Sequence, residues 1–205
     1  MYKGERVIKQ MIENFKSNGM ELIFVKNKEE AFKIGKSYIK PGITVGLGGS
    51  TTVKDIGLLG YLLQRDDIKV FNQYEEGITL EENEQRRREG LLSDLYITGT
   101  NALSINGELI NSDGSGNRVA AQIFGPKKLL IFAGVNKIVN SVEEGFKRIK
   151  EVAIPKNIER INQMSIKNGK EPIYNEKNIA NKFSYINGDK EGRTTIILID
   201  EELGF

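Results

Sequence analysis

Hydrophobic and polar positions along this chain predict alternating helices and strands. Helices are predicted, mostly from apolar residues three or four positions apart, at residues 5–18, 28–39, 53–64, 79–92, 117 onward, 141–153 and 155–164. Short apolar runs bounded by turn residues predict strands at residues 21–25, 43–47, 68–72, 95–98, 102–105, 108–111, 128–133, 183–186 and 194–200. This alternation predicts an α/β fold, with a mainly parallel sheet of five or six strands covered by helices on both faces.

An Asn106-Gly107 pair joins two of the short runs and predicts a β-hairpin. Both turn positions of such a two-residue connection need positive φ, which Asn and Gly adopt readily. We expect the hairpin to be added to the parallel sheet and to project over its edge as a partial lid. The lid would carry Glu108 toward whatever binds there.

The length of the chain, 205 residues, is enough for one domain with a sizeable core. We predict a single domain over residues 1–205, in which residues 167–205 form a C-terminal appendage. The appendage would contain a polar loop at 167–181, followed by the last two predicted strands paired with each other.

Two Gly-rich junctions connect a strand to a helix. The first is Gly46-Leu-Gly-Gly-Ser-Thr-Thr52, and the second is Asp113-Gly-Ser-Gly-Asn117. Backbone N–H groups in such loops and at helix starts bind anions. Helix capping is the alternative explanation at both places, and the first loop lacks the Gly-Lys-Ser/Thr ending of a Walker A loop. Because such junctions gather at one edge of a parallel sheet, we expect both to line one pocket.

The composition narrows the chemistry further. The chain has no Cys and no His, which excludes disulfides, thiolate nucleophiles, iron–sulfur ligation and the usual general base. Tight zinc or iron binding is therefore not expected, whereas Mg²⁺ held by carboxylates and ligand oxygens stays open. A net charge of +2 favours neither nucleic acid nor a membrane surface as a partner. The N-terminus lacks a signal-peptide core and no apolar run is long enough to span a membrane, so we expect a cytoplasmic protein.

Charged side chains near the junctions are candidates for binding and catalysis. Arg118 could hold a carboxylate or phosphate, or it could form a structural ion pair with Asp113 or Glu108. Asp113 could act as a base, or it could cap the helix and orient Arg118. Lys137 is expected at the rim, and one arginine of residues 86–88 could reach in from the side. The predicted catalytic residues are Asp113 and Glu108, and the predicted ligand-binding residues are Gly48, Gly49, Ser50, Thr51, Thr52, Thr98, Gly99, Asn101, Gly116, Asn117, Arg118 and Lys137.

Five segments resemble the LUD domain (lactate utilisation) family. They are GLGGSTT at 46–52, TGTNALSINGELINSDGSGNRVAAQIFGPKK at 98–128, GVNKIV at 134–139, IPKNIERI at 154–161 and IILIDEELGF at 196–205. The resemblance implies a three-layer α/β/α sandwich, the fold shared by ribose-5-phosphate isomerase and CoA transferases. Residues 46–52 of this chain resemble the phosphate-binding loop of the isomerases in the superfamily that shares this fold.

The same resemblance implies a role in oxidising L-lactate to pyruvate, with a small carboxylate or phosphate as ligand and with iron–sulfur or flavin subunits as partners. The sequence leaves open whether the protein forms a homo-oligomer. Many relatives carry several Cys where residues 167–181 of this chain have none, so we predict neither a metal cluster nor a resident cofactor. The alternatives are a free-standing isomerase or ligase acting on a sugar phosphate or a folate-like compound, and a non-catalytic metabolite sensor.

Overall fold

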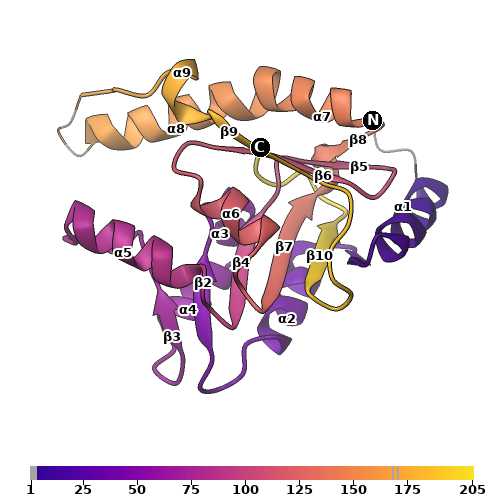
Figure 1. Ribbon diagram of the computed structural model, residues 1–205, viewed down its shortest axis with the longest axis horizontal. Helices are drawn as coiled ribbons and strands as arrows, with labels where there is room; N and C mark the ends of the chain where they lie inside the picture. The colour runs from indigo at the N-terminus through magenta and orange to yellow at the C-terminus, as the bar shows by residue number, and fades with distance from the viewer. Residues whose placement is uncertain (1–3, 168, 170) are drawn as a thin grey trace.

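A six-stranded parallel sheet forms the centre of the computed structural model, which describes residues 4–167, 169 and 171–205 (Figure 1). The strands lie in the order β1-β10-β7-β4-β2-β3, and each neighbouring pair is parallel. Their bounds are β1 Glu21–Val25, β2 Thr44–Leu47, β3 Lys69–Phe71, β4 Leu95–Gly99, β7 Lys128–Gly134 and β10 Thr194–Ile199. All the carboxyl ends of these strands therefore meet at one edge of the sheet.

Helices cover both faces of this sheet because successive side chains of its central strands point to opposite sides. In β7, Leu129 and Ile131 belong to one core cluster, whereas Leu130 and Phe132 belong to the other. The first cluster includes residues of α1 (Glu5–Ser17) and α6 (Asn117–Ile123); the second includes residues of α2 (Lys28–Ser37), α3 (Thr51–Asp55) and α4 (Leu58–Leu63). The helix α5 (Leu80–Gly90) packs against β2 and β3. The predicted α/β/α sandwich is confirmed.

A second, four-stranded sheet lies between the first core cluster and a further layer of helices (Figure 1). Its order is β8-β5-β6-β9, with β5 Ala102–Ser104, β6 Leu109–Asp113, β8 Ile138–Val139 and β9 Lys182–Ile186. Leu103 and Leu109 face the first core, while Ala102 and Ile110 face the helical layer. That layer consists of α7 (Val142–Arg148), a π-helical turn (Ile149–Ala153) and α8 (Ile154–Lys167).

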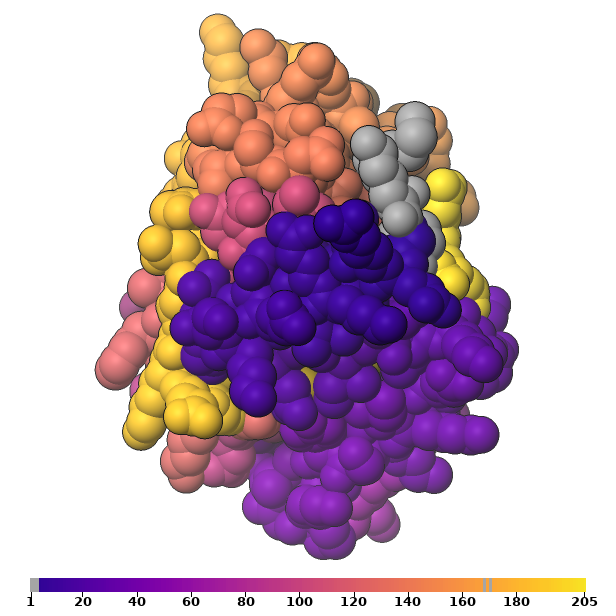
Figure 2. All heavy atoms as spheres, turned by 90° about the vertical axis from the view of Figure 1, so that its right-hand side faces the viewer, coloured from indigo at the N-terminus to yellow at the C-terminus, as the bar shows by residue number. Residues whose placement is uncertain are grey.

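The tip of the β5–β6 hairpin packs against α1 (Figure 2). Asn14 Nδ2 donates to the carbonyl of Ile105 at 2.8 Å, and Asn18 Nδ2 donates to the carbonyl of Gly107 at 3.0 Å. Gly107 has φ 88°, and a Cβ there would lie 2.7 Å from the carbonyl carbon of Asn14. The expected lid is therefore wrong, because these contacts hold the hairpin tip on the helix.

The C-terminal third also differs from the prediction. The last two strands do not pair with each other: β9 pairs with β6, and β10 inserts between β1 and β7. Residues 167–205 are therefore not an appendage, since β10 is a central strand of the main sheet. The predicted loop contains a short helix, α9 (Glu176–Ile179), which Asn175 caps. Residues 168 and 170 of that loop, and residues 1–3 of the predicted domain, lie outside the described residues.

A helix predicted at residues 53–64 is instead divided into α3 and α4. Gly57, between the two helices, has φ 79°, a left-handed conformation that glycine adopts without steric cost. None of the helices that the structure describes is long and apolar enough to cross a bilayer.

Candidate functional site

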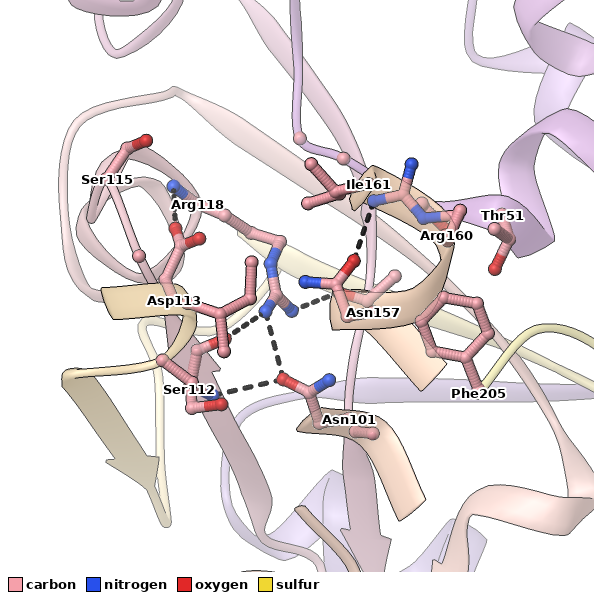
Figure 3. A pocket seen from close by; sticks show the side chains of 18 of the residues that line it. Thr51, Asn101, Ser112, Asp113, Ser115, Arg118, Asn157, Arg160, Ile161 and Phe205 are labelled. Atoms are coloured by element: carbon pink, nitrogen blue, oxygen red, sulfur yellow. Dashed lines mark hydrogen bonds between the residues drawn. The ribbon is translucent and has the colours of Figure 1, made fainter. Parts of the chain in front are cut away.

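A cavity of about 840 Å³ lies where β2, β4 and β6 end, and α8 and α9 contribute its opposite wall (Figure 3). The strand ends contribute residues 48–51, 99–101 and 112–115 to its lining. The helical wall contributes Asn157, Arg160, Ile161, Gln163, Met164, Asn178 and Ile179. Ligands of open α/β sheets bind at this edge, beyond the carboxyl ends of the strands.

The loop after β2 fits closely against β4, which explains its glycines. A Cβ at Gly48 would lie 2.3 Å from the Oγ1 of Thr98, a fully buried side chain. At Gly49 a Cβ would first meet the hydroxyl of Tyr74, at 2.9 Å. Ser50 caps α3, because its Oγ accepts a backbone N–H hydrogen bond at 3.2 Å. Packing therefore accounts for Gly48 and capping for Ser50, whereas Gly49 faces the cavity.

Neutral oxygen atoms hold the buried guanidinium of Arg118 (Figure 3). Nη1 donates to Asn111 Oδ1 at 2.9 Å, and Nη2 donates to Asn101 Oδ1 at 2.9 Å and to the carbonyl of Ser112. Only 8% of Arg118 is exposed, and it forms no ion pair with any described carboxylate. A buried charge is normally paired. The positive charge of Arg118 therefore has no compensating negative charge among the described residues.

Asp113 caps α6. Its Oδ2 accepts a hydrogen bond from the backbone N–H of Arg118 at 3.0 Å, and it makes no ion pair with the guanidinium. Glu108 is not among the residues that line the cavity. It accepts hydrogen bonds from the hydroxyls of Ser104 and, at 2.9 Å, Tyr185. The expectation that Glu108 acts as a base at this site is corrected, because its carboxylate is used within the second sheet.

Lys137 is buried rather than placed at a rim. The strand β7 leads directly into a 3₁₀ turn, Val135–Lys137, and the Lys137 Nζ donates to Thr52 Oγ1 at 3.1 Å. Only 3% of the residue is exposed. Burial, followed by the nearby positive charges of Arg148 and Arg118, lowers the pKa of the Lys137 amine to about 7.

Two further arginines reach the cavity from α5 and α8. Arg160 Nη2 donates to Asn157 Oδ1 at 2.6 Å (Figure 3), and Arg87 donates to the hydroxyl of Ser115. The Nε atoms of Arg87 and Arg160 are buried and have no hydrogen-bond partner in the described part of the chain. Two donors in the cavity wall thus lack acceptors.

Arg87 is one of the three arginines at residues 86–88, and the sequence analysis expected that one of them could reach into the site from the side. Arg160, Asn157 and Tyr74 were missed by the sequence analysis. A signal for part of this wall exists in the sequence, since Asn157, Arg160, Ile161 and Met164 recur at helical spacing and share one face of α8.

Basic side chains outnumber acidic ones in the lining of the cavity. Asp113 is the one acidic side chain among the described residues that line the cavity, against six basic ones. None of the six forms an ion pair with a described carboxylate. Over residues 4–167, 169 and 171–205, no group of three acidic side chains could hold a metal ion. The basic residues are Lys54, Arg87, Arg118, Lys137, Arg160 and Lys167.

The cavity brings together most of the residues expected at the site. Thr52, Thr98 and Gly116 are not part of its lining: Thr52 binds Lys137, Thr98 packs under Gly48, and a Cβ at Gly116 would lie 2.7 Å from Lys182. Those that line the cavity are Gly48, Gly49, Ser50, Thr51, Gly99, Asn101, Asp113, Asn117, Arg118 and Lys137.

One solved structure and one family model agree with this architecture. A DUF162 family protein from Deinococcus radiodurans has a similar crystal structure, with a TM-score of 0.54 and 14% sequence identity over 95% of this chain and 96% of that one. The β subunit of eIF2B from Chaetomium thermophilum gives a TM-score of 0.38, with 15% identity over 57% of this chain and 44% of that one. A search of curated proteins found no match. The sequence model of the LUD domain matches residues 8–199. This chain, with its parallel sheet and the cavity at its strand ends, belongs to the LUD domain family.

Proposed function

We propose that this protein binds a small anionic metabolite, bearing a carboxylate or a phosphate, in the cavity at the strand ends. The observation that carries the proposal is the buried guanidinium of Arg118, which pairs with no described carboxylate, together with the half-buried guanidinium of Arg160 in the same cavity. Removing a charged group from water costs several kcal/mol unless a partner compensates it. An anionic ligand would supply that partner.

The best-defined place for an anion is the wall that Arg87 and Arg160 share. Both residues line the cavity and neither forms an ion pair with a described carboxylate, so an anionic ligand there would meet two uncompensated positive charges. Tyr74 lines the same cavity, and the charges of both guanidinium groups act on its hydroxyl, which places the two groups near one side chain. Arginine pairs with carboxylate and phosphate in a two-pronged geometry.

The family supports lactate or pyruvate as the ligand, and we extend the proposal to an accessory subunit of L-lactate oxidation. The chain has no Cys, so an iron–sulfur centre that takes up electrons would belong to a partner subunit. We expect the purified protein to bind lactate or pyruvate without oxidising lactate when an artificial electron acceptor is added. Steady oxidation of lactate by the protein alone would contradict the accessory role.

The size of the cavity favours a second candidate. Its volume of about 840 Å³ is far larger than lactate and falls within the range of pockets that enclose drug-sized ligands. A sugar phosphate or a folate-like compound would fill more of it. The protein would then be an isomerase or ligase acting on such a compound, or a sensor of it.

A calorimetric titration tests the proposal and separates the candidates. The ligands are lactate, pyruvate, inorganic phosphate, ribose 5-phosphate and folate, with lactamide as the uncharged analogue of lactate. We expect at least one anion to bind and lactamide not to bind.

Arg118→Met should weaken that binding. Lys147→Met is the matched control, because Lys147 is exposed on α7 and its loss removes the same charge away from the cavity. Equal binding of lactamide, or equal losses in the two variants, would contradict the proposal.

A further inference from the structure

We infer that the amine of Lys137 is a nucleophile that forms a reversible imine with an anionic carbonyl compound, either a 2-oxo carboxylate or a phosphorylated aldose, bound in the cavity. This inference rests on the proposed function and deepens it, because it assigns a covalent role to one lining residue and a carbonyl group to the ligand.

The hydrogen bonds around Lys137 suit a neutral amine better than an ammonium. An ammonium has three N–H donors and needs acceptors for all of them when buried. Among the described residues, Thr52 Oγ1 is the one acceptor within hydrogen-bond distance of Nζ, and that hydroxyl itself donates to the carbonyl of Leu203 at 3.3 Å. A neutral amine needs fewer acceptors and keeps a lone pair for attack on carbon.

The charges that face Lys137 act in the same direction. Arg148 from α7 and Arg118 from α6 disfavour a further positive charge, while Asp55 from α3 opposes them weakly. Burial and these two arginines lower the amine pKa to about 7, so the nucleophilic neutral form is far more populated at neutral pH than in an exposed lysine. An ordinary exposed lysine is almost fully protonated there. Amines made reactive in this way form Schiff bases with carbonyl substrates.

The position of Lys137 within the cavity suits an anionic carbonyl compound. Lys137 lines the same cavity as Arg118, Arg160 and Arg87, so the ligand's carboxylate or phosphate can pair with a guanidinium while its carbonyl carbon approaches Nζ. The 3₁₀ turn at Val135–Lys137 and the contact with Thr52 fix the amine in place. A fixed amine beside a held substrate removes much of the entropic cost of the encounter.

The reaction needs no further reactant. The nitrogen lone pair attacks the carbonyl carbon, and the carbonyl π electrons move to oxygen. A proton passes from nitrogen to that oxygen, which gives a neutral carbinolamine. Loss of the oxygen with two protons as one water molecule then forms the carbon–nitrogen double bond. Nothing is oxidised or reduced, and hydrolysis by the reverse path regenerates the amine.

Reductive trapping tests the inference. The full-length protein is incubated near neutral pH with sodium cyanoborohydride and either pyruvate or ribose 5-phosphate, and the modified peptides are quantified by mass spectrometry. We expect the reduced adduct on Lys137 to exceed that on Lys147, an exposed lysine of the same molecule, by roughly tenfold or more. The pyruvate and ribose 5-phosphate reactions distinguish the two ligand classes.

Two controls define the remaining outcomes. Lactate has no carbonyl group and should give no adduct, and Lys137→Arg should abolish specific labelling while keeping a cationic side chain. Peptide mapping of the unaltered protein decides the question even if that variant does not fold. If calorimetry shows that pyruvate or ribose 5-phosphate binds but Lys137 is labelled no more than Lys147, the imine is overturned and the anion site stands. If no anion binds at all, the proposed function fails and the imine fails with it.

Discussion

The carboxylate of Asp113 accepts a hydrogen bond from the backbone N–H of Arg118, while the guanidinium of the same arginine binds only neutral oxygen atoms. The two side chains are neighbours, yet their charges are not paired with each other. The carboxylate holds the start of α6 in place, and the guanidinium lines the cavity without a paired carboxylate. This separation of roles leads to different expectations for the two residues.

Asp113→Ala should destabilise the protein by about 0.5–2 kcal/mol, the usual cost of losing a side-chain cap. Asp113→Asn should retain most of the stability, because its amide oxygen can accept the same N–H hydrogen bond. Neither variant should weaken anion binding. Denaturant unfolding and calorimetry check both expectations. If Asp113→Asn binds anions normally but loses turnover of a ligand, Asp113 is a base after all.

Arg118→Lys should lose anion affinity and also destabilise the fold by roughly 1–3 kcal/mol. A lysine has one nitrogen at the end of its side chain in place of the separate Nη1 and Nη2 that reach Asn111, Asn101 and Ser112, so at least one buried acceptor should be left unpaired. Arg193→Lys offers a comparison, since Arg193 is also held by carbonyl oxygens but lies outside the cavity. It should lose stability without losing affinity. An Arg118→Lys protein with unchanged affinity would show that this guanidinium serves the fold alone.

Gly48 and Gly49 should respond differently to replacement by alanine. A Cβ at Gly48 overlaps the buried side chain of Thr98, so Gly48→Ala should cost about 1–3 kcal/mol in stability. A Cβ at Gly49 meets the end of the Tyr74 side chain beside the cavity, so Gly49→Ala should mainly reduce ligand affinity. Melting temperature and calorimetric affinity separate the two effects. The same pattern of losses in both variants would argue against a ligand close to this loop.

Lys137→Met should change the pH dependence of stability. Because the folded-state pKa of Lys137 is lowered to about 7, the unfolded chain binds one more proton than the folded one between that value and the ordinary lysine pKa. The stability of the wild-type protein relative to Lys137→Met should therefore rise with pH, by about 1.4 kcal/mol per pH unit above about pH 7. Below that value the difference should be constant. Urea unfolding of both proteins from about pH 6 to about pH 9 measures this slope. A flat difference across the range would mean that the folded-state pKa is not lowered.

Glu108→Gln should leave ligand affinity unchanged and reduce stability by about 0.5–1.5 kcal/mol at most. Its carboxylate binds the hydroxyls of Ser104 and Tyr185 within the second sheet, away from the cavity. Gln retains an acceptor for one of them. A loss of ligand binding or turnover in a stably folded Glu108→Gln protein would restore Glu108 to the site.

The sequence predicted those features that local pattern determines. The continuous apolar run of β7 and the glycines after β2 are visible in short windows, and both were placed correctly. The position of β10 could not be predicted, because parallel pairing leaves no turn signal between partners. Its apolar residues identify a strand but do not say which strands lie beside it.

The residues of the candidate site also fall into those that local motifs predict and those that depend on tertiary packing. Gly49 and Arg118 belong to motifs that can be recognised along the chain. Arg160 and Tyr74 reach the cavity only because distant segments approach it. Lys137 is likewise buried next to residues far away in the chain, such as Thr52 and Gly204. Charge pairing is likewise a property of three-dimensional neighbours, so the free guanidinium of Arg118 could not be distinguished from a paired one.

The insertion of β10 between β1 and β7 also constrains the order in which this protein can fold during its synthesis. β1 lies at the end of the main sheet, and its neighbour there is β10, with Glu21 aligned to Thr195. A ribosome delivers residues 21–25 before residues 194–199, so the apolar strand β1 must wait for its partner while the intervening chain is made. Strands β2, β3, β4 and β7 can associate earlier, because all of them precede β10 in the chain. Strand β1 thus emerges before its partner and is among the last strands of this sheet to be incorporated, and its exposed apolar side chains are where chaperone binding or aggregation would act on the nascent chain.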